Sequence, residues 1–158
     1  MPKPAPIDVY QEVKSIYTEL ENRPIERNCT AQTTCCRFKL TGKTPYLTKA
    51  EALVAAKAWR ATGRRFPKPS ADGACPMLES ATGRCLIYES RPFGCRTHFC
   101  QAAGGPYSRR EVVDLIHRLE DLSRALGQNE AMPFHSALDS ALRDPTPQGV
   151  PSQPYRRY

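Results

Sequence analysis

The sequence predicts a small, mainly α-helical domain in which three or four helices surround an irregular, cysteine-rich loop region stapled by metal. Apolar residues recur at helical intervals on both sides of the middle of the chain, whereas all seven cysteines stand from Cys29 to Cys100, among prolines and glycines. A chain of 158 residues leaves little room for two independent cores. We therefore expect one domain over residues 1–143, with its metal-binding segment at 29–100.

The first two helices are expected at residues 7–22 and 48–62. In the first, apolar residues stand three and four positions apart, as on one face of a helix, and the run ends before Pro24. The second opens on Thr48 and Glu51, which have the spacing of a capping box, and its alanine-rich run ends before Gly63.

Two further helices are expected after the cysteines. Ser108 and Glu111 form a second capping box, and the apolar stripe that follows predicts a helix over residues 108–127. A shorter helix is expected over 133–143. Residues 144–158 contain four prolines and show no aliphatic periodicity, which predicts a disordered, proline-rich tail.

The region between these helices predicts little regular structure. Residues 29–40 are expected to form an irregular loop that leads into a short extended segment at 37–41. Prolines and glycines then recur from Pro67 to Gly94 and leave room only for a short strand at 86–88.

The clustering of the thiols predicts a metal site. Cysteines that pack as small hydrophobes would be scattered, whereas neighbouring thiols reduce the loop entropy of assembling the four ligands that zinc prefers. An odd number of thiols cannot all pair within one chain, and in a reducing compartment clustered thiols favour ligation over disulfides. The predicted ligands are Cys29, Cys35, Cys36, Cys75, Cys85, Cys95 and Cys100.

The segment C-L-I-Y-E-S-R-P-F-G-C-R-T-H-F-C, which starts at Cys85 and follows Cys75-Pro76, resembles the YkgJ-like cysteine-cluster family of zinc- or iron-chelating domains. The resemblance covers about residues 29–100. It implies a cysteine where this chain has Gln32, so one thiol of the first half is missing. Because Gln is a poor ligand for zinc or iron, a shared thiolate, water or His98 is expected to complete that half.

Three residues of the same segment are expected to support the metal without binding it. Arg91 and Arg96 are predicted to donate hydrogen bonds to metal-bound thiolates, and Glu89 is a salt-bridge partner for one of them. The alternative is an ordinary surface ion pair. His117 and His135 stand in the later helices and do not join the cluster by sequence.

The function predicted from these features is non-catalytic binding of one or two zinc ions. One alternative is an iron–sulfur protein, for which the similarity of this family to the cysteine-rich domain of flagellin lysine methylases implies a redox or methyl-transfer role. A zinc-stapled nucleic-acid-binding module, suggested by the net charge of +7, is weaker because the basic residues are dispersed. Only Glu89 offers a carboxylate inside the tight cysteine segment, so the sequence leans away from an enzyme.

The expected surroundings are those of a cytoplasmic protein. The sequence contains neither an apolar run long enough to cross a membrane nor the apolar stretch of a signal peptide at its start. The metal ion is the expected partner, and a protein partner is left open.

Overall fold

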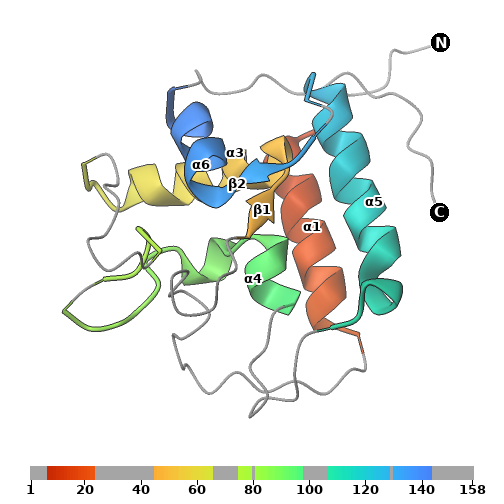
Figure 1. Ribbon diagram of the computed structural model, residues 1–158, viewed down its shortest axis with the longest axis horizontal. Helices are drawn as coiled ribbons and strands as arrows, with labels where there is room; N and C mark the ends of the chain where they lie inside the picture. Colours follow the sequence, from red (N-terminus) through yellow and green to blue (C-terminus); the bar gives the residue numbers. More distant parts are fainter. Residues whose placement is uncertain are drawn as a thin grey trace.

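Figure 1 shows a computed structural model of the chain, which describes residues 7–23, 45–65, 75–79, 81–97, 107–128 and 130–143. Its helices are α1 (Val9–Glu21), α3 (Lys49–Ala61), α4 (Phe93–Thr97), α5 (Arg109–Ala125) and α6 (Phe134–Arg143). A 3-10 turn, η2 (Tyr88–Ser90), precedes α4. Strands β1 (Tyr46–Leu47) and β2 (Met132–Pro133) pair antiparallel, with Tyr46 opposite Pro133. The predicted mainly helical fold class is confirmed.

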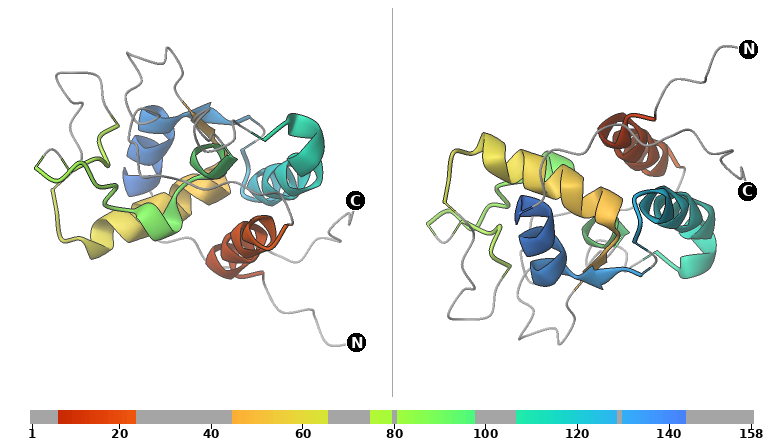
Figure 2. Two further views of the ribbon diagram at one scale, coloured as in Figure 1. Left: turned by 90° about the horizontal axis from the view of Figure 1, so that it is seen from below. Right: turned by 90° about the horizontal axis from the view of Figure 1, so that it is seen from above.

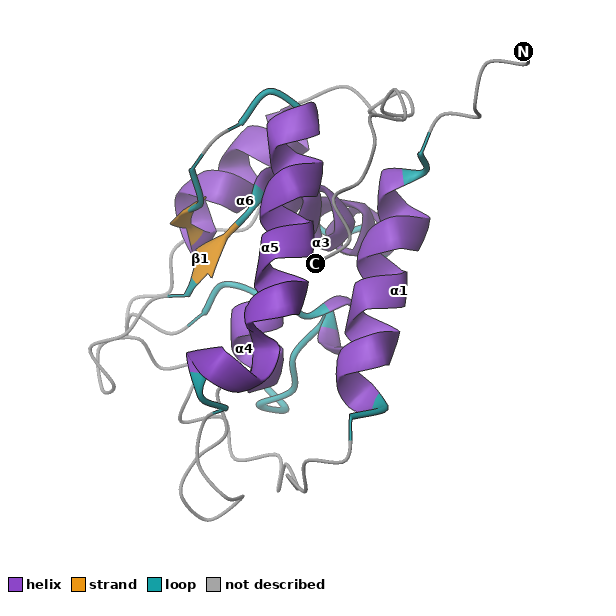
Figure 3. Ribbon diagram, turned by 90° about the vertical axis from the view of Figure 1, so that its right-hand side faces the viewer, coloured by secondary structure: helices purple, strands orange, loops and turns teal. Residues whose placement is uncertain are grey.

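The longer helices pack as two pairs around one core. Helices α1 and α5 lie side by side and run in opposite directions, whereas α3 crosses α6 in the other half of the molecule (Figures 1 and 2). Helix α3 also contacts α1 and α5, and so joins the two pairs. Figure 3 shows α4 near the end of the α1–α5 pair where α1 ends and α5 begins.

Helix α1 forms where the apolar periodicity predicts it. The side chain of Asp8 accepts hydrogen bonds from the backbone N–H groups of Tyr10 and Gln11, which otherwise lack partners at a helix start. The face that packs inward is fully apolar apart from one phenol group; its buried residues are Val9, Val13, Ile16, Tyr17 and Leu20.

Ion pairs join α1 to α5. Arg23, just beyond the end of α1, contacts the carboxylate of Asp114 at 2.5 Å and donates to the backbone carbonyl of Glu111 at 2.7 Å. Arg118 of α5 contacts Glu12 and Glu19 on α1. These side chains are partly exposed, so the pairs align the helices more than they stabilise the fold.

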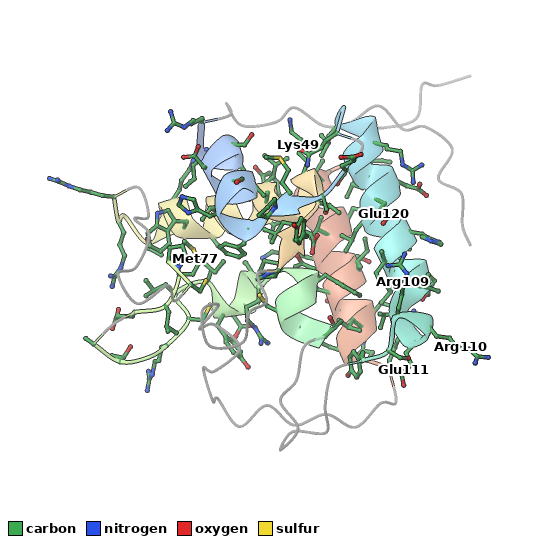
Figure 4. All side chains as sticks on the ribbon, in the orientation of Figure 1. Lys49, Met77, Arg109, Arg110, Glu111 and Glu120 are labelled. Atoms are coloured by element: carbon green, nitrogen blue, oxygen red, sulfur yellow. The ribbon has the colours of Figure 1, made fainter. Side chains whose placement is uncertain are left out.

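Helix α3 is the centre of the core. The predicted capping box is present, with Thr48 and Glu51 bonded to each other's backbone N–H groups. Small alanines let α6 approach closely, and Leu53, Trp59 and Phe134 fill the remaining space. Helix α5 opens on its own predicted capping box, whose Glu111 is labelled beside Arg109 and Arg110 in Figure 4.

The predicted strand at 86–88 is wrong. Leu78 and Cys85 form an isolated antiparallel bridge, after which Leu86 and Ile87 lie in a turn that leads into η2. The β-branched and aromatic side chains of Ile87 and Tyr88 favour a strand. The carbonyls of Glu89 and Arg91, however, accept hydrogen bonds from the buried side chain of Arg96, which suits a turn and not an extended chain. The extended segment at 37–41 and the tail at 144–158 lie outside the described residues.

The short elements α4, β1 and β2 were not expected from the sequence. No helix in the described part of the chain is both long and apolar enough to cross a membrane.

Candidate metal centre

Three of the seven predicted ligands, Cys75, Cys85 and Cys95, lie among the described residues. The other four cysteines and His98 lie outside them, so the complete predicted ligand set is not described. Within the described residues alone, no group of three or more Cys, His, Asp or Glu side chains has the arrangement of a metal site.

A tight turn joins Cys75 to Cys85. The backbone N–H of Leu78 donates to the carbonyl of Cys75 at 3.0 Å, and that of Leu86 donates to the carbonyl of Met77 at 2.9 Å. Gly83, with a φ of +69°, takes the left-handed conformation that closes the turn. Met77, labelled in Figure 4, is fully buried and anchors the turn in the core. Cys75 is buried within that core, and Cys85 is half-buried and packs against it.

Cys95 is positioned by α4, whose first turn is fixed from outside. The carboxylate oxygen Oε1 of Glu51 accepts a hydrogen bond from the backbone N–H of Phe93 at 2.7 Å. Pro92, which has no N–H and a fixed φ, precedes the helix, and its carbonyl accepts from the N–H of Cys95 at 3.0 Å. The first backbone N–H of α4 is therefore capped by a carboxylate from α3.

Glu51 is a buried acid with two tasks. Its Oε2 closes the capping box of α3 through the backbone N–H and hydroxyl of Thr48, while its Oε1 holds Phe93. Burial raises the pKa of Glu51, and the hydrogen bonds from Thr48 and Phe93 oppose that rise. The sequence predicted the first task, whereas the second depends on a residue 42 positions away.

Arg96 ties α4 and η2 to α1. Its Nε donates to the carbonyl of Arg91 at 2.7 Å, and one terminal nitrogen donates to the carbonyl of Glu89 at 2.6 Å. The other terminal nitrogen meets the carboxylate of Glu21 at 2.7 Å. The side chain of Arg96 is 6% exposed, and burial lowers its pKa.

The described contacts of Arg91 and Glu89 also concern the backbone. The guanidinium of Arg91 lies 3.9 Å from the ring centre of Tyr88, and its Nε donates to the carbonyl of Tyr88 at 3.0 Å. Glu89 is exposed, and its carbonyl, rather than its carboxylate, receives Arg96. Hydrogen bonding of Arg91 and Arg96 to metal-bound thiolates stays a prediction, as does the supporting role of Glu89.

Tyr17 of α1 also belongs to this site, although the sequence marks it only as part of an apolar helix face. Its ring lies 4.1 Å from the guanidinium carbon of Arg96, the residue that follows Cys95 in α4. Burial raises the pKa of Tyr17 well above its usual value, with a further contribution from Glu51. Among the described residues, this buried hydroxyl has no hydrogen-bond partner. No sequence pattern marks a buried hydroxyl of this kind, so sequence reasoning had no means to find it.

The described residues that border the undescribed cysteine segments gather around α4. The backbone N–H of Tyr107 donates to the carbonyl of Thr97 at 2.8 Å. The two described residues that flank the segment with His98 and Cys100 therefore lie side by side. A Cβ atom added to Gly94 would stand 3.5 Å from Cβ of Pro45, which follows the segment that carries the first three cysteines. Helix α4, with Cys95, therefore lies beside a border of each segment.

The described donors fit a thiophilic ion. Cys75 lies in the core, Cys85 packs against it and Cys95 is half-buried on α4. The carboxylate of Glu51 already accepts three hydrogen bonds. Zinc and iron–sulfur clusters take thiolates, whereas magnesium and calcium require oxygen ligands. The chemistry of this donor set therefore matches zinc or iron.

Comparison with known families agrees with the residues. Residues 27–116 match the model of the family named CxxCxxCC, described as "Putative zinc- or iron-chelating domain". The match begins before the first cysteine and ends within α5, which leaves α1 outside it. No curated protein and no solved structure gives a significant match. The resemblance predicted from the cysteine segment is confirmed: this chain belongs to the CxxCxxCC family of zinc- or iron-chelating domains.

Proposed function

We propose that this protein binds zinc through its clustered cysteines and performs no catalysis of its own. Family membership supports binding of zinc or iron. One observation carries the proposal further: Cys85 and Cys95 lie on a segment whose backbone is held to the helical core by groups other than sulfur. Glu51 fixes the start of α4, and Arg96 fixes the turn before it.

The ligands we propose fall into two unequal halves. Cys75, Cys85, Cys95 and Cys100 offer a complete set of four thiolates, which suits a closed tetrahedral zinc site. Cys29, Cys35 and Cys36 form the half that lacks one thiol at Gln32. His98, a shared sulfur or water completes that second half.

Anchoring of this kind suits a structural ion. Zinc has no redox chemistry, and a site with four protein ligands has no open position for a substrate. Two described carboxylates contact α4: that of Glu51 is buried and hydrogen-bonded to the backbone, and that of Glu21 is paired with Arg96, so both are poorly placed to activate water. These features support metal retention over catalysis.

Anaerobic purification without added metal, followed by elemental analysis and an absorption spectrum, tests the proposal. We expect zinc in stoichiometric amount and no visible colour. Iron with sulfide and a broad band near ~400 nm would replace zinc by an iron–sulfur cluster. Absence of both metals from the wild-type protein would refute metal binding through these cysteines.

Replacement of a single thiol then tests the ligand set. Cys95→Ser should lower the bound zinc and its affinity, because a hydroxyl is a far poorer zinc ligand than a thiolate. Thr97→Ser, two residues further along α4, is the matched control and should retain full zinc content. Equal zinc content and affinity in both variants would remove Cys95 from the ligands.

A further inference from the structure

The hydroxyl of Tyr17 is a polar group on the face of α1 that packs inward. Tyr17 is 3% exposed, and its oxygen has no hydrogen-bond partner among the residues the structure describes. Burial of such a group without a partner costs about 1–3 kcal/mol. Phenylalanine would fill the same space without this cost, so a tyrosine at this position points to a hydrogen-bond partner beyond the described contacts.

The groups around Tyr17 narrow the choice of partner. Arg96, which lies against its ring, has only N–H donors and cannot accept the hydroxyl hydrogen. Both carboxylate oxygens of Glu51 already accept hydrogen bonds from Thr48 and Phe93. Cys95 precedes Arg96 in α4, the short helix whose arginine lies against the Tyr17 ring, and it is among the groups that raise the pKa of Tyr17.

Metal binding would change the acceptor strength of Cys95. A neutral thiol accepts hydrogen bonds weakly, whereas a metal-bound sulfur is deprotonated and carries negative charge. A buried thiolate of this kind is stabilised by N–H or O–H donors directed at it, and such outer donors also orient the ligand. Arg96 lies on the side of α4 that faces α1, because its guanidinium stacks on the ring of Tyr17 and pairs with Glu21.

We propose that Tyr17 is a positioning residue for the metal site: it donates its hydroxyl hydrogen to the sulfur of Cys95 when that sulfur coordinates zinc. The proposal rests on the proposed function, because it requires Cys95 to be a ligand. The hydroxyl keeps its proton throughout, and the proton released on metal binding comes from the thiol of Cys95. Helix α1, which lies outside the family match, thereby takes part in the metal site.

The variant Tyr17→Phe, which removes only the hydroxyl, tests this role. Zinc affinity, measured on the purified full chain by competition with a chromophoric chelator, should fall about 10–100-fold, as is typical when an outer hydrogen-bond partner of a metal ligand is lost. In the Co²⁺-loaded protein, the thiolate-to-metal charge-transfer band should shift, because the electron density on sulfur changes. The thermal stability of the metal-free variant should be equal to or above that of the wild type.

Tyr10→Phe is the matched control, since Tyr10 stands on the same helix with its ring 4.2 Å from the ammonium of Lys57. It should change neither zinc affinity nor the cobalt spectrum. If Tyr17→Phe leaves both unchanged while the wild type binds zinc, the role of Tyr17 is refuted and zinc binding stands. If the wild type binds no zinc, the proposed function and this inference fall together.

Discussion

Replacement of Arg96 by lysine should destabilise the protein far more than the same change at Arg91, although both belong to one R-P-x-x-C-R motif. Arg96 donates to the carbonyls of Glu89 and Arg91 and lies against Tyr17. Lysine keeps the charge but lacks the planar fork, so it can satisfy one of these carbonyls but not both. A hydrogen bond from a charged donor is worth about 1.5–3 kcal/mol.

The expected loss for Arg96→Lys is therefore about 2–4 kcal/mol, one charged hydrogen bond plus part of the contact with the ring. The ion pair with Glu21 adds little, because the side chain of Glu21 is 63% exposed. Arg91→Lys gives up an exposed stacking contact on Tyr88 and an exposed hydrogen bond to its carbonyl, for which water substitutes, so we expect a loss below about 1 kcal/mol.

Urea denaturation, followed by circular dichroism on both variants with and without saturating Zn²⁺, measures these losses. Stability of Arg96→Lys within about 0.5 kcal/mol of the wild type would refute the anchoring role given to Arg96. An equal loss in Arg91→Lys would show that the buried position of the Arg96 guanidinium makes no difference in this motif, since both variants keep the charge and lose the planar fork. A larger deficit with zinc than without it would support hydrogen bonding from Arg96 to metal-bound sulfur.

Two other predictions concern the backbone that carries the thiols. Glu51→Ala should lose about 2–4 kcal/mol in chemical denaturation, because the N–H groups of Thr48 and Phe93 are left without their acceptor. Because the pKa of Glu51 is raised above 4.5 in the folded protein, the folded state binds more protons at this carboxyl than the unfolded state does, and wild-type stability falls as the pH rises from 4.5 through the folded pKa. This pH dependence should be absent from Glu51→Ala. If it persists there, Glu51 is not its source. Gly83→Ala should lower the free energy of unfolding by about 1–2 kcal/mol, measured by thermal unfolding, because Gly83 has a left-handed φ of +69°. Nothing lies within 4 Å of an added Cβ, so the backbone conformation alone would cause this loss. An unchanged stability would mean that the turn relaxes to a φ that alanine accepts.

The four longer helices were predictable because their signals are local. Capping boxes at Thr48 and Ser108, and apolar stripes at intervals of three and four, lie within the helices that they define. The bounds agree to within about two residues, which is the usual uncertainty of helix ends. Helix α4 was missed because its first N–H is capped by Glu51, far away in sequence, and no local pattern records that contact.

The sequence predicted the chemistry of the site but not the side-chain contacts that hold its backbone in place. Seven clustered thiols and the R-P-x-x-C-R segment indicate zinc or iron, and family membership agrees. The sequence cannot show that Arg96 turns toward backbone carbonyls, because that depends on where η2 curls. Tyr17 looked like any other residue of an apolar face, since a buried hydroxyl is distinguished only by the lack of a partner.

The arrangement has a consequence for the energetics of metal binding. In a small zinc domain without a core, the free energy of metal binding must offset the conformational entropy that the whole chain loses when it becomes ordered. Here α1, α3, α5 and α6 share a continuous apolar core, and Glu51 with Arg96 attaches the segment of Cys85 and Cys95 to it without any contribution from sulfur. Less chain remains to be ordered by the ion, so more of its intrinsic affinity is retained as observed affinity. The hydroxyl of Tyr17, which has no partner among the described residues, acts in the same direction in the role we propose for it, because the cost of its burial falls on the metal-free protein and is relieved when it donates to the metal-bound sulfur of Cys95.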